Sequence, residues 1–274
     1  MYYKKDIVIS INFTGEINQL ELLNHLVQVF SPMEKEKMEL TYVIKEPSEK
    51  SLKIKARGGV LNKKTLANFE KNIKLHDKKE IIIPGFSLHS NLSGWVYRAI
   101  DTSFATTYYT YNNSAIKTLN MTLDVDNNKN LDVMSFIENN FLKYLVFKNC
   151  VCVYAFVFAC EKKQMPLVFL KGVHTEFLNK YEDKKVSIWS ENQNTCDKKV
   201  LDVFWGNIIS KEHLKKVSVE DIERFVGKNN VFSITPDLLW FNLPEDLLKF
   251  EFSKYSWKRK RIYRFFEKKQ LIMN

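Results

Sequence analysis

The sequence predicts an α+β protein with antiparallel sheets, helices packed on one face, and two ferredoxin-like halves. Strand-like alternation and helix-like periodicity follow one another loosely in the order β-α-β-β-α-β. The 274 residues are 45% hydrophobic, which suffices for a packed core, and only 8 are glycine. So little glycine disfavours phosphate-binding Gly-rich loops, collagen and β-propellers. No Ser/Gly/Pro-rich linker is present, so the halves 1–126 and 127–274 are expected to pack tightly or to form one domain.

Strands and helices alternate along the first half. Apolar residues recur at helical spacing from Ile17 to Phe30, with Thr14 as the expected N-cap and Pro32 as the stop signal. A second helical pattern covers residues 63–75. Segments rich in β-branched and aromatic residues, or with alternating polarity, predict strands. These lie at 6–13, 38–45, 52–56 and 81–83, with two or three more antiparallel strands within 92–124.

The second half shows the same mixture. Apolar spacing predicts a strong helix over 131–147, and the longest apolar run, 151–159, predicts a central strand. Ser218 is the expected N-cap of a later helix. The remaining predictions are strands at 167–170, 200–209, 231–234 and 238–241, the last two forming a hairpin around Pro236-Asp237, and helices at 175–181, 213–217, 219–226 and from about 256.

The positive charge is concentrated near the C-terminus. The chain has a net charge of +10, but residues 254–269 hold eight basic residues and one acid, a local charge of +7. If this segment is helical, Trp257, Arg261, Arg264 and Lys268 lie along one stripe. Its aromatic side chains are expected to dock on the core. The remaining positions then present either a solvated basic face or a surface for an acidic partner or for nucleic acid.

No sequence pattern of a catalytic or metal site occurs. The motifs G-x-S-x-G, H-E-x-x-H and G-x-x-x-x-G-K-[ST] are absent, and the five histidines and four cysteines have no zinc-ligand spacing. Cys150, Cys152 and Cys160 fall on one face of the predicted strand and, like Cys196, are expected to be buried structural thiols. We therefore expect no catalytic residue, no metal and no cofactor. An enzyme would require groups that meet only in the folded chain.

Membrane and export signals are also absent from the sequence. No apolar run approaches the 18 residues or more of a membrane-spanning helix. The N-terminal residues lack the long apolar region and the small-residue cleavage site of a signal peptide. We therefore expect no membrane span and a cytoplasmic location.

The segment from Val200 to Glu245 carries a family resemblance. The strand Val203-Phe204-Trp205 is followed by a Gly206-Asn207 step, a short helix with His213-Leu214, a second helix, and a hairpin that runs through Phe232 and Trp240 to Pro244. This order resembles the C-terminal part of bacterial immunity proteins linked to type VI secretion, the immunity protein 52-like group. The upstream helix at 131–147 and the strand at 151–158 also fit that order.

The resemblance implies a non-enzymatic antidote that binds a cognate protein toxin and blocks it. It marks no catalytic residues. The basic C-terminal segment adds the expectation that the toxin offers an acidic patch to Lys258, Arg259, Arg261 and Arg264. The alternative is a nucleic-acid-binding protein that uses the same basic, aromatic segment to contact phosphates and stack bases.

Overall fold

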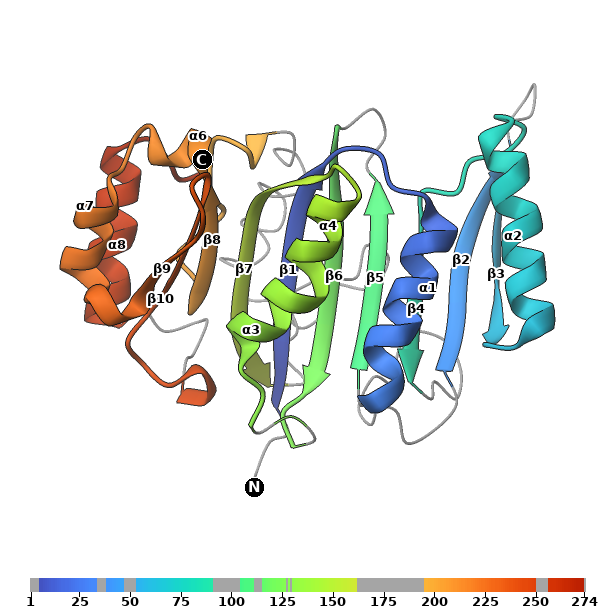
Figure 1. Ribbon diagram of the computed structural model, residues 1–274, viewed down its shortest axis with the longest axis horizontal. Helices are drawn as coiled ribbons and strands as arrows, with labels where there is room; N and C mark the ends of the chain where they lie inside the picture. The colour runs from blue at the N-terminus through green and yellow to red at the C-terminus, as the bar shows by residue number, and fades with distance from the viewer. Residues whose placement is uncertain are drawn as a thin grey trace.

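A single antiparallel sheet organises the computed structural model, which describes residues 5–33, 38–46, 53–90, 104–110, 115–126, 128, 130–161, 195–249 and 256–273. Ten strands of these residues lie in the order β3-β2-β4-β5-β6-β1-β7-β8-β10-β9 (Figure 1). Six helices pack against them, if α3, a π-helical turn and α4 are counted as one continuous helix. The predicted α+β class is confirmed.

The strands are β1 (Lys5–Thr14), β2 (Met38–Glu46), β3 (Lys53–Val60), β4 (Gly85–Ser90), β5 (Phe104–Thr110), β6 (Ile116–Asp124), β7 (Val151–Glu161), β8 (Gly206–Ser210), β9 (Val231–Thr235) and β10 (Leu238–Asn242). The helices are α1 (Gln19–Phe30), α2 (Lys63–Asp77), α3 (Val133–Ile137), the π-helical turn Glu138–Leu142, α4 (Lys143–Phe147), α6 (Lys211–Leu214), α7 (Val219–Val226) and α8 (Trp257–Lys268). Short 3₁₀ turns cover Ser31–Met33, Lys228–Asn230 and Leu247–Lys249, the last labelled η7.

β1 joins the two predicted halves. It pairs with β6 on one side, where Ile9 lies opposite Met121, and with β7 on the other, where Ile9 lies opposite Val157. Since β7 comes after the expected division at residue 126, that division does not separate two sheets. The prediction of two ferredoxin-like halves is wrong, because the first strand of the chain pairs with a strand about half the sequence away.

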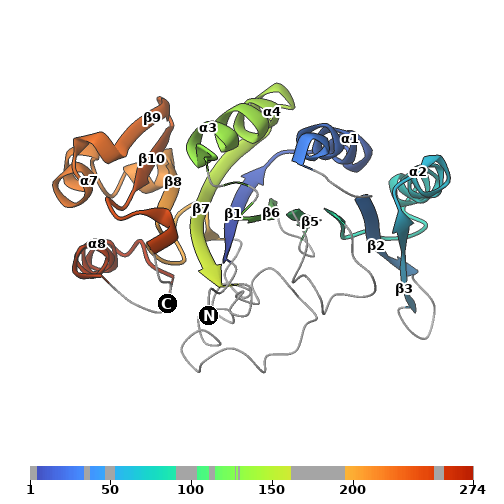
Figure 2. The same ribbon diagram turned by 90° about the horizontal axis from the view of Figure 1, so that it is seen from below.

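Helices cover both faces of the sheet. Alternate residues of a strand point to opposite faces. Ala155 and Val157 of β7 belong to the apolar cluster with α1, α2 and α3, whereas Phe156 and Phe158 belong to the cluster with α7 and α8. Figure 2 shows α1 to α4 in a row along one side and α7 and α8 together near β8 and β10. The prediction that all helices pack on one face is therefore wrong.

A β-bulge near the start of β7 redirects its cysteines. Asn12 of β1 pairs with Tyr154, but the next residue, Phe13, pairs with Cys152, so the register shifts by one residue. Cys152 therefore lies with Cys150 in the cluster under α1, while Tyr154 lies in the opposite cluster. Strict alternation along the strand would place residues 152 and 154 on the same face of the sheet, and the bulge places them on opposite faces. The thiols of Cys150, Cys152 and Cys196 are free and buried; the side chain of Cys160 lies outside the described part.

Local signals placed many of the other elements. The helices predicted over 63–75 and 131–147 are α2 and α3–α4, and the hairpin predicted around Pro236 is β9–β10. The strand predicted at 81–83 is wrong, because among its residues only Ile82 forms a bridge, to Lys45. The strand predicted at 200–209 begins only at Gly206. The elements predicted at 167–170 and 175–181 fall outside the described residues.

α1 begins later than its expected cap. Thr14 is the last residue of β1, and Asn18 is the N-cap, with its side-chain oxygen accepting hydrogen bonds from the backbone amides of Leu20 and Glu21. Asn and Thr are both favourable caps, so residue type alone did not choose between them. The predicted stop near Pro32 is confirmed, since α1 ends at Phe30.

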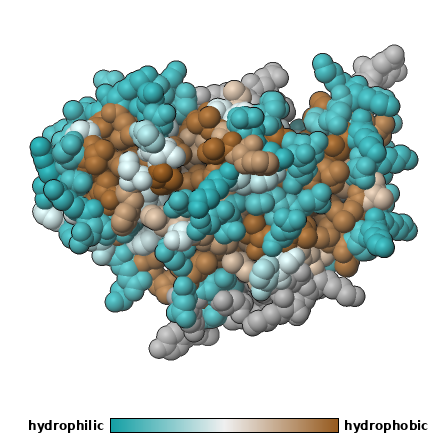
Figure 3. All heavy atoms as spheres, viewed as in Figure 1, coloured by the Kyte–Doolittle hydropathy of each residue, from teal (hydrophilic) through white to brown (hydrophobic). Residues whose placement is uncertain are grey.

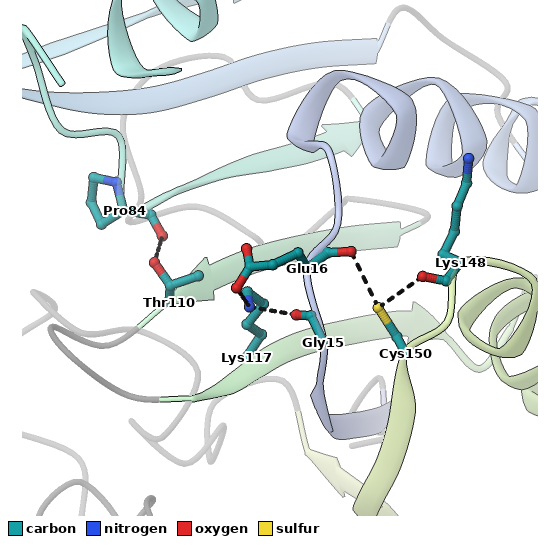
Figure 4. A network of polar contacts seen from close by, with 7 residues as sticks. All are labelled: Gly15, Glu16, Pro84, Thr110, Lys117, Lys148 and Cys150. Carbon is teal, nitrogen blue, oxygen red and sulfur yellow. Dashed lines mark hydrogen bonds and ion pairs between the residues drawn. The ribbon is translucent and has the colours of Figure 1, made fainter. Parts of the chain in front are cut away.

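A polar junction fixes the turn between β1 and α1 (Figure 4). The ammonium group of Lys117, from β6, donates to the Gly15 carbonyl at 2.5 Å and contacts the Glu16 carboxylate at 3.0 Å. The Cys150 thiol lies 3.6 Å from the Glu16 carbonyl. Gly15 has φ +111°, and a Cβ there would lie 2.9 Å from the Cys150 Cα, so the turn requires glycine. This junction holds three strands together, since Cys150 immediately precedes β7.

Candidate protein-binding surface on α8

α8 is an amphipathic helix anchored by one narrow stripe. Ser256 caps it by accepting a hydrogen bond from the backbone amide of Arg259. Ile262 and Phe266 are buried in the cluster with α7, β8 and β10, and the Phe266 ring packs edge-on against Phe241 at 5.9 Å. The sequence prediction of a basic C-terminal helix is confirmed.

Arg259 lies inside the protein. Its guanidinium is 3.1 Å from the Asp202 carboxylate, and its Nε donates to the Val203 carbonyl at 2.6 Å. Only 1% of the Arg259 side chain is exposed. The prediction that Arg259 contacts a partner is corrected, because the side chain ties α8 to the segment before β8. The spacing to Ile262 and Phe266, three and seven residues on, places Arg259 on the buried stripe and was the signal for this role.

The other three predicted contact residues reach solvent. Lys258, Arg261 and Arg264 are exposed on α8, as are three more cations of the segment, Lys260, Lys268 and Lys269. The structure therefore places Lys258, Arg261 and Arg264 on the exposed side of one helix, whereas Arg259 is on its buried side. Glu267 is the one acid of α8, so the exposed side of this helix is strongly positive.

Two aromatic rings flank Arg261. Its guanidinium lies 4.6 Å from the ring centre of Trp257 and 5.5 Å from that of Phe225, which comes from α7. The expectation that the aromatic residues of this segment dock on the core is confirmed for Phe266, Tyr263 and Phe265 and is wrong for Trp257, which is 67% exposed. Phe225 was missed, because only the packing of α7 against α8 brings it there. We call Trp257, Lys258, Arg261, Arg264 and Phe225 the α8 surface.

Buried titratable groups elsewhere serve the fold. Burial lowers the pKa of His213 to about 4, against weaker opposing contributions from hydrogen bonds with the Lys199 and Cys196 backbone. Burial likewise lowers the pKa of His89 to about 4. Burial raises the pKa of the Cys152 thiol to about 12, so this thiol is not a ready nucleophile. Among the residues that the structure describes, no three or more His, Cys, Asp or Glu side chains form a group that could hold a metal ion.

One pair of carboxylates meets on the face of the sheet opposite α1. Asp6 of β1 lies directly opposite Asp124 of β6, and both are buried. Their residue types fit acid–base chemistry, but both already take part in further interactions within the protein. We therefore place the candidate site on α8.

Comparison with known proteins found no family model, no curated protein and no solved structure that matches this chain. The fold defines an α+β protein with one ten-stranded antiparallel sheet. Within the described residues, no helix has the length and apolar character needed to cross a membrane.

Proposed function

We propose that this chain is a non-enzymatic binding protein that neutralises a cognate bacterial toxin, like the type VI secretion-linked immunity proteins it resembles in sequence order. The observation that carries the proposal is the exposed Trp257 beside Arg261, whose guanidinium lies over both its ring and that of the half-buried Phe225. Trp and Arg are the residue types most enriched among the energetic hot spots of protein interfaces.

The α8 surface can both attract a partner from a distance and bind it on contact. Its cations attract an acidic patch on the toxin and raise the association rate. The exposed Trp257 ring then offers apolar area for burial. Because the Arg261 guanidinium already lies over two rings, this side chain loses little freedom on binding. An acidic, toxin-like domain is therefore the partner that this surface fits best.

Co-expression tests this function. The chain is expressed with each product of a neighbouring gene that arrests growth when expressed alone, and growth rescue is compared between the wild type and the Trp257→Ala/Arg261→Ala variant. We expect rescue by the wild type and its loss in the variant. The matched control, Lys64→Ala/Lys71→Ala, removes two exposed cations from α2 and keeps the rescue. Absence of rescue by the wild type rejects the proposed function, and equal rescue by all three rejects the α8 surface.

Nucleic-acid binding is the second candidate, and the same surface supports it. An exposed Trp257 beside Lys258, Lys260 and Arg264 offers one base-stacking ring and several phosphate contacts. A salt titration with a labelled single-stranded oligonucleotide separates the two functions. Binding that weakens steeply with salt and is lost in Lys258→Ala/Lys260→Ala/Arg264→Ala supports nucleic acid, whereas no binding at low salt removes this candidate.

A further inference from the structure

A groove opens on the face of the sheet opposite α7 and α8. It has a volume of about 610 Å³ and lies between the start of α3, the β9–β10 hairpin and the η7 turn. Trp240 and Phe232 lie opposite each other on β10 and β9 and form part of its wall. Apolar side chains reach the surface over this hairpin, beside α3 (Figure 3). The row of helices that covers this face over the rest of the sheet stops at α3 (Figure 2).

The groove is acidic although the chain as a whole is basic. Asp132 and Asp246 line it, and its described lining holds no Lys, Arg or His, in a chain of net charge +10. Asp132 accepts hydrogen bonds from the backbone amide and hydroxyl of Ser135, and Asp246 accepts one from the amide of Leu248. These bonds fix the carboxylates in position and leave their negative charge in place. Lys5 does not line the groove, but its ammonium group donates a hydrogen bond to the carbonyl of Leu248, which does.

Trp205 and Phe232 are the partly exposed aromatic side chains of the same groove, whereas Trp240, which also lines it, is only 1% exposed. The Trp205 and Trp240 rings meet edge-to-face at 6.1 Å. Their indole N–H groups are held by the Glu245 carbonyl at 2.6 Å and the Asn242 side chain at 3.2 Å. Phe232 is 43% exposed. Aromatic rings beside carboxylates attract ammonium and guanidinium groups, through the ring quadrupole and the negative charge together.

We propose that this groove binds an apolar segment of a protein partner that carries lysine or arginine. Apolar side chains of the segment cover the aromatic wall, and its cation lies near Asp132 and Asp246. Among the strands that the structure describes, β9 is the last in the sheet order, so an extended segment can reach the groove past β9. The groove is separate from the α8 surface and has the opposite charge preference, so this proposal does not depend on toxin neutralisation.

Isothermal titration calorimetry with a capped heptapeptide of alternating leucine and arginine tests the groove. We expect the wild-type chain to bind this peptide and not to bind the matched peptide with glutamine in place of arginine, which carries no charge that the basic α8 surface could attract. Asp132→Asn/Asp246→Asn is expected to weaken binding about 10-fold or more, and Phe232→Ala similarly. Asn caps a helix as well as Asp does, so the Asn variant keeps α3 folded, which thermal melting verifies.

The control variant, Asp77→Asn/Glu80→Gln, removes two exposed acids at the far end of α2 and is expected to bind like the wild type. No binding of the arginine peptide overturns the proposal, and so does equal binding by the Asn variant. Equal affinity for the glutamine peptide also overturns it, because the groove would then select only apolar character. Concentration-dependent self-association of the free chain that Phe232→Ala abolishes would assign the groove to a second copy and likewise overturn it.

Discussion

Arg259 and Asp202 form an ion pair inside the protein, with 3.1 Å between the guanidinium and the carboxylate and both side chains essentially inaccessible to water. The pair connects α8 to the segment that precedes β8, and the Arg259 Nε adds a bond to the Val203 carbonyl. One basic residue of α8 thus holds the helix in place, while its neighbours Lys258, Arg261 and Arg264 stay outside. The α8 surface is presented by a helix with a fixed orientation.

Removal of this guanidinium should destabilise the fold. Arg259→Ala leaves the Asp202 charge in a buried environment, and breaking one side of a buried pair costs about 3–5 kcal/mol. Lys258→Ala, on the exposed side, should change the free energy of unfolding by less than about 0.5 kcal/mol. Urea denaturation measures both. A cost below about 1 kcal/mol for Arg259→Ala would contradict the structural role assigned to the pair.

The exposed and buried aromatic residues of α8 should separate binding from folding. Phe266→Ala empties a buried site and should cost about 3–5 kcal/mol. Trp257→Ala should leave stability within about 0.5 kcal/mol of the wild type, because its ring is mostly in water. Thermal unfolding of the two variants checks this. A large loss of stability in Trp257→Ala would mean that its ring supports the core rather than a partner.

Gly206 should not tolerate a side chain. A Cβ at this position would lie 2.5 Å from the Trp240 ring, and that ring is fully buried. Gly206→Ala is therefore expected to cost about 1–3 kcal/mol through overpacking. In a Trp240→Phe background, the smaller ring leaves room, and the cost of Gly206→Ala should shrink. Urea denaturation measures the loss in free energy of unfolding that Gly206→Ala causes in each background. Equal losses would show that the backbone conformation, and not the Trp240 ring, requires glycine at position 206.

Acid should destabilise the protein through His213. Its Nδ1 accepts a hydrogen bond from the Ser210 amide, which requires the neutral ring, and burial lowers its pKa from 6.5 to about 4. The unfolded chain binds the proton more readily, so stability is complete above about pH 6.5 and falls as the pH drops toward 4. The full loss is about 3 kcal/mol. His89 adds a loss over the same range.

Unfolding free energies at pH 7 and pH 5 measure this dependence. His213→Gln, which does not titrate, should show a smaller difference between the two values than the wild type. An unchanged difference would mean that groups other than His213 control acid stability.

The sequence predicted elements well where periodicity is local. Apolar spacing located α2 and α3–α4, and Pro236-Asp237 marked the β9–β10 turn. Periodicity failed at the start of β7, because a bulge that inserts one residue reverses which face each side chain takes. For Arg259, the error came from residue type and not from periodicity. Residue type suggested solvent, while the position on the Ile262–Phe266 stripe meant burial.

By itself, the sequence determined the α+β class, the concentration of positive charge in a C-terminal helix, and the absence of familiar catalytic motifs. The tertiary structure decided that β1 joins one continuous sheet, that helices cover both faces, and which side chains of α8 reach solvent. The physical reason is that periodicity shows which residues share a face of an element. Which face is buried depends on neighbours that come from distant parts of the chain. For α8, those neighbours are Asp202, Val203 and Phe241.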